Sequence, residues 1–260
     1  MEYITKQLTI ELAGGSNWVE FVKWSFDGKY LATTSGKFLK IWTKEGSLVS
    51  EYKDVDSTIT GICWKKDSSE LIISGYGGIK FLKPQSATPH QIFAWKNSMI
   101  SLSWSPDEKF IGAGTQDAKV HFWEVPYIQN SDFEMTGYPG KIRAMSWDST
   151  SDYFALSSLE QIVVWKFAGK PPLGAAPLDL NGHTHKVTQL LFQNNHKVLA
   201  SGDISGKVLY WYVGHLNFPF AESQTNSEIT FMTWSHDDAE LAVGTKDGEL
   251  IVFEMESLIG

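Results

Sequence analysis

Short apolar runs that end in an aromatic residue recur along the whole chain. Each recurrence begins with an anchor residue that closes a run of alternating polarity, and the anchors are Trp24, Trp64, Trp104, Trp147, Phe192 and Trp234. Successive anchors are separated by 40, 40, 43, 45 and 42 residues. A period of about 40 to 45 residues is that of a four-stranded blade in a β-propeller. The spacing therefore predicts six repeats of one small sheet.

Positions at fixed distances after each anchor keep their character. A turn-forming residue such as Asp27 comes three positions later, and an apolar residue such as Leu31 comes seven positions later. A second aromatic series then follows: Trp42, Phe81, Trp123, Trp165, Trp211 and Phe253. The runs between these positions, such as "YLATT" and "QIVVW", are short, rich in β-branched residues and bounded by turns, which indicates strands. Each repeat is predicted to hold three such strands and a more polar fourth, outer strand.

The two ends of the chain predict how the repeats close. The sixth repeat stops after its third strand, "ELIVFEM", whereas residues 6–12 alternate apolar Leu8, Ile10 and Leu12 with polar residues. We expect this N-terminal segment to supply the missing outer strand of the last repeat. The predicted fold is all-β: a single domain over residues 1–260, forming a six-bladed propeller of four-stranded antiparallel blades.

Composition and charge limit which compartment and which class of partner we expect for the protein. The chain is 42% hydrophobic, which is enough for a core, and its formal net charge of -8 disfavours binding to nucleic acid or to an anionic membrane. The single cysteine, Cys63, excludes an internal disulfide framework. The start, "MEYITKQLTI", lacks the pattern of a signal peptide, and no apolar run is long enough to span a membrane. We expect a soluble, cytoplasmic monomer whose partners are proteins.

The residues at these recurring positions resemble those of the WD-repeat β-propeller family along essentially the whole chain. That family carries Gly-His before the first strand, Asp in the turn between the second and third strands, and Trp-Asp at the end of the third. Here Gly182-His183 is the one matching Gly-His, the turn Asp is present at Asp117 and Asp247, and the fifth repeat has Ser205 instead. No third strand ends in Trp-Asp. The resemblance implies a hydrogen-bonded bracing cluster, which on this alignment no repeat completes.

Two stretches, "GYGGIKF" and "GYPGKIRAMSW", also resemble stand-alone bacterial WD-repeat proteins. Such members often have further N-terminal blades, so this chain is also interpretable as a short form of a seven- or eight-bladed relative.

Three features of the sequence are candidate sites of chemistry. Cys63 precedes an anchor and is not accompanied by a column of histidines, which favours a packed small residue over a nucleophile. His183 and His185 could both turn to one metal ion, but a site needs three or four ligands. The alternative function is a lactonase-like hydrolase at the channel mouth, for which the first strands offer a single acid, Glu20. We expect no catalysis, metal or cofactor.

The candidate binding residues lie in the turns that this fold gathers on one face, called the top face in the WD-repeat family. They are the aromatic residues Trp18, Tyr76, Trp95 and Tyr138, and the basic residues Lys141, Arg143, His183, His185 and Lys186. Instead of binding a partner, the aromatic residues could pack over the edge of a blade, and His183 could hold its own blade together through hydrogen bonds. Asp54 and Asp56 would make another side of the face acidic. The hypothesis is a non-catalytic scaffold that recognises an acidic-aromatic or phosphorylated segment of a partner protein.

Overall fold

The computed structural model describes residues 10–15, 18–54, 56–128 and 131–255. They form strands joined by turns, with no helix in these ranges and so none that could cross a membrane. The chain divides into two compact units, Met1–Met99 and Ile100–Gly260. The single domain expected over residues 1–260 stays a prediction.

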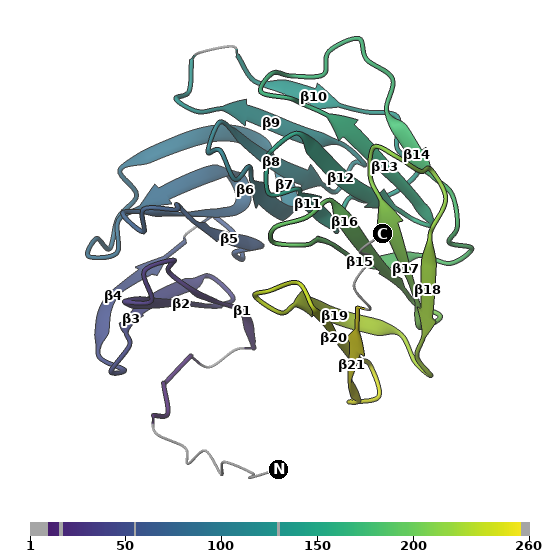
Figure 1. Cartoon of the computed structure of the whole chain (residues 1–260). Coiled ribbons are helices and arrows are strands. Elements are labelled where there is room, and N and C mark those ends of the chain that lie inside the picture. The colour runs from purple at the N-terminus through teal and green to yellow at the C-terminus, as the bar shows by residue number, and fades with distance from the viewer. Residues whose placement is uncertain (1–9, 16–17, 55, 129–130, 256–260) are drawn as a thin grey trace. The chain divides into compact units, whose positions relative to one another are not determined.

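Unit 1 contains the first two repeats (Figure 1). Its strands are β1 (Val19–Trp24), β2 (Tyr30–Ser35), β3 (Phe38–Thr43), β4 (Leu48–Lys53), β5 (Gly61–Trp64), β6 (Leu71–Leu82) and the first part of β7 (Gln91–Trp104). The strands β1 to β4 pair antiparallel in chain order. Trp24 stands opposite Leu31, which stands opposite Trp42. The three predicted columns of the first repeat are therefore one row across its sheet.

Unit 2 continues from β7 and contains the remaining repeats (Figure 1). Its strands are β8 (Phe110–Thr115), β9 (Val120–Glu124), β10 (Phe133–Met135), β11 (Met145–Trp147), β12 (Tyr153–Ser158), β13 (Gln161–Lys166), β14 (Leu178–Leu180), β15 (Val187–Phe192), β16 (Val198–Asp203), β17 (Lys207–Tyr212), β18 (Ala221–Gln224), β19 (Ile229–Trp234), β20 (Glu240–Thr245) and β21 (Leu250–Glu254). The same row recurs, since Phe192 stands opposite Leu199 and Leu199 opposite Trp211.

The number of sheets corrects the prediction of six. The described strands make five sheets, because β5 to β10 belong to one six-stranded sheet. Strand β6 includes both the second and the third strand expected for the second repeat, and β7 joins the outer strand of that repeat to the first strand of the third. The residues that would separate the two parts of β7, Lys96 to Ser98, include no Gly or Pro. These residues therefore include no strand breaker that would end β7 between its two parts.

The expected closure of the last sheet falls partly outside the described residues. Within the part that the structure describes, the last sheet has three strands, β19 to β21. Of the segment predicted to add a fourth, residues 6–9 are not described, and residues 10–12 form no strand. Ile10 and Leu12 instead lie against Gly46 of unit 1, where an added Cβ would come within 2.6 Å of Ile10 Cγ2. The closure stays a prediction.

Within each unit, neighbouring repeats pack face to face through apolar rows. In unit 2 the core between the last two sheets includes Ala200, Tyr210, Met232 and Val243, all buried. The small residue Gly202 lets the sheets approach, since an added Cβ would lie 2.9 Å from Ile229. Burial of these apolar surfaces is the main source of stability for such stacked sheets.

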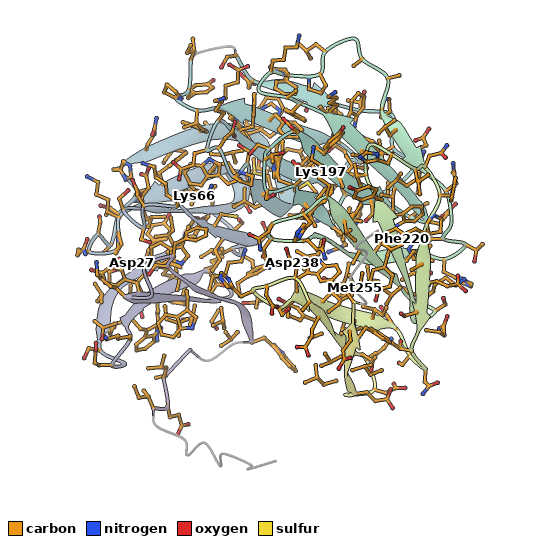
Figure 2. All side chains as sticks on the ribbon, viewed as in Figure 1. Asp27, Lys66, Lys197, Phe220, Asp238 and Met255 are labelled. Atoms are coloured by element: carbon orange, nitrogen blue, oxygen red, sulfur yellow. The ribbon has the colours of Figure 1, made fainter. Side chains whose placement is uncertain are left out.

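Polar contacts add specificity to this stacking. The indole Nε1 of Trp64 donates to the carbonyl of Lys23, and that of Trp234 donates to the carbonyl of Leu191. In these two repeats the anchor residue hydrogen-bonds to the first strand of the preceding repeat, whereas Trp104 Nε1 donates to the carbonyl of Glu108 in its own repeat. At the turns, the carboxylate of Asp238, labelled in Figure 2, accepts the backbone N–H of Asn194 at 2.7 Å.

Candidate protein-binding surface

The turns of unit 2 that were predicted to share a face are joined by hydrogen bonds. The backbone N–H groups of Val187, Ile204, Thr225 and Lys246 donate to the carbonyls of Leu159, Lys186, Gly206 and Glu228 respectively, at 2.8 to 3.0 Å. These bonds link successive turns along the unit. We call the turns and loops at this end of the sheets the loop surface of unit 2. It comprises residues 116–119, 136–144, 159–160, 181–186, 204–206, 225–228 and 246–249.

One loop of this surface is clamped onto the end of β12. The hydroxyl of Ser158 donates to the carbonyl of Gly140 at 2.9 Å and accepts the N–H of the same residue at 2.8 Å. The N–H of Ser157 donates to the carbonyl of Ala144. Because both ends of residues 140–144 are fixed, the side chains of Lys141 and Arg143 are presented from a defined backbone.

Four predicted basic residues are exposed on the loop surface. Lys141 and Arg143 lie in the loop that hydrogen-bonds to the end of β12. His185 and Lys186 lie in another loop, and the residue that follows them, Val187, donates its N–H to the carbonyl of Leu159. Lys141 Nζ donates to Gln116 Oε1 at 3.0 Å. Among the described residues, none of these four side chains forms an ion pair with a carboxylate. The loop surface thus presents four basic side chains without ion pairs to described carboxylates, next to exposed acids of the same surface such as Glu160 and Asp247.

His183 does not share this exposure. Its ring lies inside the fifth repeat, with Nδ1 2.7 Å from Asp203 Oδ2 and Nε2 2.7 Å from Ser201 Oγ. Trp211 Nε1 donates to the same Ser201 hydroxyl at 2.7 Å. The expectation that no repeat completes the bracing cluster was therefore wrong. The carboxylate comes from Asp203, two residues before Ser205, and Ser205 in turn donates to Asp203.

Burial sets the charge state of this cluster. Burial lowers the pKa of His183 below its ordinary 6.5, and it outweighs the attraction of Asp203, which acts in the opposite direction. Burial raises the pKa of Asp203, but the hydrogen bonds from Ser205 and His183 outweigh it and leave that pKa lowered. A neutral imidazole beside a carboxylate, with each ring nitrogen bonded, braces the sheet and leaves no exposed edge for a partner.

The aromatic residues divide between packing and exposure. In unit 2 the Tyr138 hydroxyl accepts a hydrogen bond from Trp165 Nε1 at 2.9 Å, and burial raises the pKa of Tyr138 to about 12. Tyr138 therefore packs against its own repeat. In unit 1, Trp18 is 89% exposed just before β1, and Tyr76 is 50% exposed. Trp95 is half-buried in β7, opposite Gly77.

The two acidic residues expected on the top face belong to an ion cluster in unit 1. Lys80 Nζ lies 2.7 Å from Asp54 Oδ1 and 2.7 Å from Asp56 Oδ2. Burial lowers the pKa of Lys80, but hydrogen bonds to the two carboxylates outweigh it and leave the pKa raised. Lys80 and Asp54 are buried, so the positive charge is paired rather than exposed. Nothing in the sequence pattern singled out Lys80.

The residues considered for chemistry have other partners. Glu20 Oε2 accepts the N–H of Gly36 at 3.0 Å, His183 is engaged in the bracing cluster, and His185 Nδ1 lies 3.1 Å from the Thr184 hydroxyl. Within the described ranges, no three residues of the types His, Cys, Asp and Glu gather as a metal site would require. The hydrolase alternative remains untested.

Comparison with known proteins gives a consistent family. The model of the family "WD domain, G-beta repeat" matches residues 6–43, 88–124 and 177–212. The chain is 25% identical over 190 residues to "Protein FIZZY-RELATED 2" of Arabidopsis thaliana, covering 70% of this chain and 37% of that protein. It is 28% identical over 135 residues to "THO complex subunit 3" of Arabidopsis thaliana, covering 50% and 42%.

A longer match covers most of the chain. It is to "Echinoderm microtubule-associated protein-like 4" of Homo sapiens, with 21% identity over 246 residues, covering 86% of this chain and 22% of that protein. The chain thus spans less than half the length of each of these relatives. The likeness to stand-alone bacterial members stays a prediction. The stretches matched by the family model, the anchor spacing and the cluster around His183 agree in indicating WD repeats of the β-propeller type, and the family model itself covers less than half of the chain.

Proposed function

We propose that the chain is a non-catalytic scaffold that binds a protein partner through the loop surface of unit 2. The observation that carries the proposal is the group of exposed basic side chains on hydrogen-bonded loops, Lys141, Arg143, His185 and Lys186. Fixed loops bind with a smaller entropic cost than mobile ones. Two relatives support the general role, since one is named as the subunit of a complex and another as a microtubule-associated protein. We place this function in the cytoplasm.

The partner segment that fits these residues is acidic or phosphorylated. Arg143 offers a planar guanidinium that can bind a carboxylate or phosphate with two parallel hydrogen bonds, and Lys186 offers a point charge nearby along the same face. The net charge of the chain is -8, so an acidic segment gains no attraction from the molecule as a whole and depends on direct contacts with these basic side chains. Tyr138 and His183 are left out of the contact because they serve their own repeats, while the exposed Trp18 and Tyr76 of unit 1 remain candidates for separate contacts.

A peptide array tests this proposal. Acidic and phosphorylated peptides are each paired with a neutral or unphosphorylated counterpart and probed with the wild-type chain and with the double variant Arg143→Glu/Lys186→Glu. Reversing two charges that contact an anion is expected to weaken binding at least about tenfold. The matched control is Lys166→Glu/Lys170→Glu, which makes the same change in net charge with exposed residues of unit 2 outside the loop surface.

The control variant should keep wild-type binding, and melting curves should show that both variants are folded. If the Arg143→Glu/Lys186→Glu variant binds the same peptides as the wild type, the loop surface is not the binding site. If both double variants lose binding equally, the interaction depends on net charge alone, which is also contrary to the proposal.

A further inference from the structure

The sequence contains one Asn-Gly pair, and it stands where the chain enters the fifth repeat. Asn181 follows the last residue of β14, and Gly182 precedes the buried His183 (Figure 1). Asparagine is among the chemically labile residues of proteins. Its side-chain carbonyl is attacked by the backbone nitrogen of the next residue, and a following glycine hinders that attack least because it has no side chain. Local structure then decides whether the reaction proceeds.

The structure leaves both reacting groups of this pair accessible. Asn181 and Gly182 are exposed. Among the described residues, neither the Gly182 N–H nor the Asn181 side-chain amide has a hydrogen-bond partner. The Asn181 N–H donates to the carbonyl of Asn217 at 3.4 Å, which is longer than usual. The attack on Asn181 therefore does not have to break a hydrogen bond of the attacking or the attacked group.

Other asparagines are held in contacts that oppose the same reaction. Asn97 Oδ1 accepts the N–H of Ser98 at 2.7 Å, and that nitrogen is the one that would have to attack. The Asn194 side chain donates to Asp238 at 2.9 Å, and the N–H of Asn195, which would attack it, donates to the same carboxylate at 2.8 Å. In both cases a hydrogen bond keeps the attacking nitrogen occupied.

Two further comparisons isolate the contribution of the glycine and of its free N–H. Asn226 is also exposed, but the residue that follows is Ser227, whose side chain hinders the attack. The chain also has two Asp-Gly pairs, which cyclise in the same way, and there the N–H groups of Gly28 and Gly248 each donate to the carbonyl three residues earlier. Among these pairs, only Asn181-Gly182 combines a following glycine with an N–H that has no described acceptor.

The main chain at this pair has little room to move. An added Cβ at Gly182 would lie 2.9 Å from Trp211 Cη2. One residue later, the His183 ring lies 2.7 Å from both Asp203 and Ser201. An additional main-chain carbon just before Gly182 would therefore displace either the glycine from Trp211 or the imidazole from its partners.

We propose that Asn181 is a site of spontaneous deamidation and isomerisation, whose isoaspartate product loosens the bracing cluster of the fifth repeat. The Gly182 nitrogen bonds to Asn181 Cγ, and its proton passes through water to the side-chain nitrogen, which leaves as ammonia. The product is a five-membered succinimide. Water then opens the ring: breaking the bond from Cγ to nitrogen gives aspartate, whereas breaking the bond from the main-chain carbonyl to nitrogen gives isoaspartate. In isoaspartate the main chain runs through the side-chain carbons and is longer by one carbon.

Peptide mapping of the folded chain tests the modification. The wild type is kept warm at mildly alkaline pH, and samples taken over time are digested with trypsin and fragmented by mass spectrometry. The tryptic peptide that ends at Lys186 has Asn181 as its only asparagine. We expect Asn181 to lose its amide first, with isoaspartate among the products, Asn226 to follow more slowly, and Asn194 to keep its amide. Loss at Asn226 as fast as at Asn181, or loss at Asn181 only after unfolding in urea, would overturn the proposal.

Denaturant unfolding tests the structural consequence. Fresh and aged wild type are compared with Asn181→Gln, which keeps an amide but would have to form a less favourable six-membered ring. The aged wild type is expected to unfold at a lower denaturant concentration, in proportion to its isoaspartate content, while aged Asn181→Gln should match its fresh sample. Fresh Asn181→Asp carries the new charge without the additional main-chain carbon and should unfold near the fresh wild type. An unchanged midpoint of the aged wild type, an equal loss in aged Asn181→Gln, or the full loss in fresh Asn181→Asp would contradict a loosened cluster.

Discussion

At the scale of single residues, the role of a side chain depends on which neighbours its strand brings near. The sequence marked Asp117, Asp247 and Ser205 as the turn position of the bracing cluster, yet the His183 ring reaches Asp203. One turn offers two polar residues two positions apart, and only the conformation of that turn decides which of them faces the imidazole. For the same reason Lys80 was missed, because its partners Asp54 and Asp56 lie more than twenty residues away in sequence.

The buried imidazole of His183 predicts a specific dependence of stability on pH. Because its pKa is lowered in the folded state, the unfolded chain binds this proton more readily below its ordinary pKa of 6.5. Stability is thus fully present above pH 6.5 and is lost as the pH falls toward the folded pKa. Denaturant unfolding between about pH 5.5 and 7.5 should show a free energy of unfolding that falls with acidification, by at most about 1.4 kcal/mol per pH unit from this group.

Two variants isolate the contribution of His183. His183→Gln should be less stable than the wild type at neutral pH but should have a flatter pH dependence below pH 6.5. His185→Gln, at an exposed neighbour, should follow the wild-type slope. Equal slopes for the wild type and His183→Gln would show that the ring titrates alike in the folded and unfolded chains.

At the scale of strands and sheets, the sequence predicted more. The anchor and aromatic columns form a row across the sheet, as in Phe192, Leu199 and Trp211, because period-two alternation fixes which residues share a face. Where one sheet ends and the next begins was not predictable from the period alone. Strands β6 and β7 continue past the expected breaks, since a repeat length says nothing about whether a local turn interrupts hydrogen bonding.

Two glycines at equivalent places in different sheets give an element-scale prediction with an internal control. Gly114 and Gly244 stand at equivalent places, nine residues before Trp123 and Phe253. An added Cβ at Gly114 would be 2.4 Å from the Ser101 hydroxyl and would overlap the Ile142 carbonyl, whereas at Gly244 the nearest atom is 3.7 Å away. Gly114→Ala should therefore lower the free energy of unfolding by about 1 to 3 kcal/mol because the neighbouring backbone must shift.

Gly244→Ala should be neutral or stabilise the chain by up to about 1 kcal/mol, since alanine restricts the unfolded chain and meets no close neighbour. Both values come from denaturant titrations at a fixed pH. A loss at Gly244 as large as the loss at Gly114 would mean that the last sheet is covered by an element in solution.

At the scale of the whole molecule, sequence reasoning placed function outside the strands, which stays a prediction, and it located turns better than it assigned single side chains. It predicted that turns would gather, and in unit 2 they are joined by hydrogen bonds. It also assigned His183 and Tyr138 to the binding face, although their side chains pack within their own repeats. The proposed contact with a partner depends on the exposed basic residues Lys141, Arg143 and Lys186 of these loops.

The most direct measurement of this central claim is capture of native partners by the intact chain, quantified by mass spectrometry. The wild type, Arg143→Glu/Lys186→Glu and Lys166→Glu/Lys170→Glu are immobilised in equal amounts and exposed to an extract of the source cells. We predict a set of proteins retained by the wild type and by the control variant but depleted at least about tenfold on the loop-surface variant. Retention of the same proteins in the same amounts on all three would contradict the assignment of protein binding to the loop surface of unit 2.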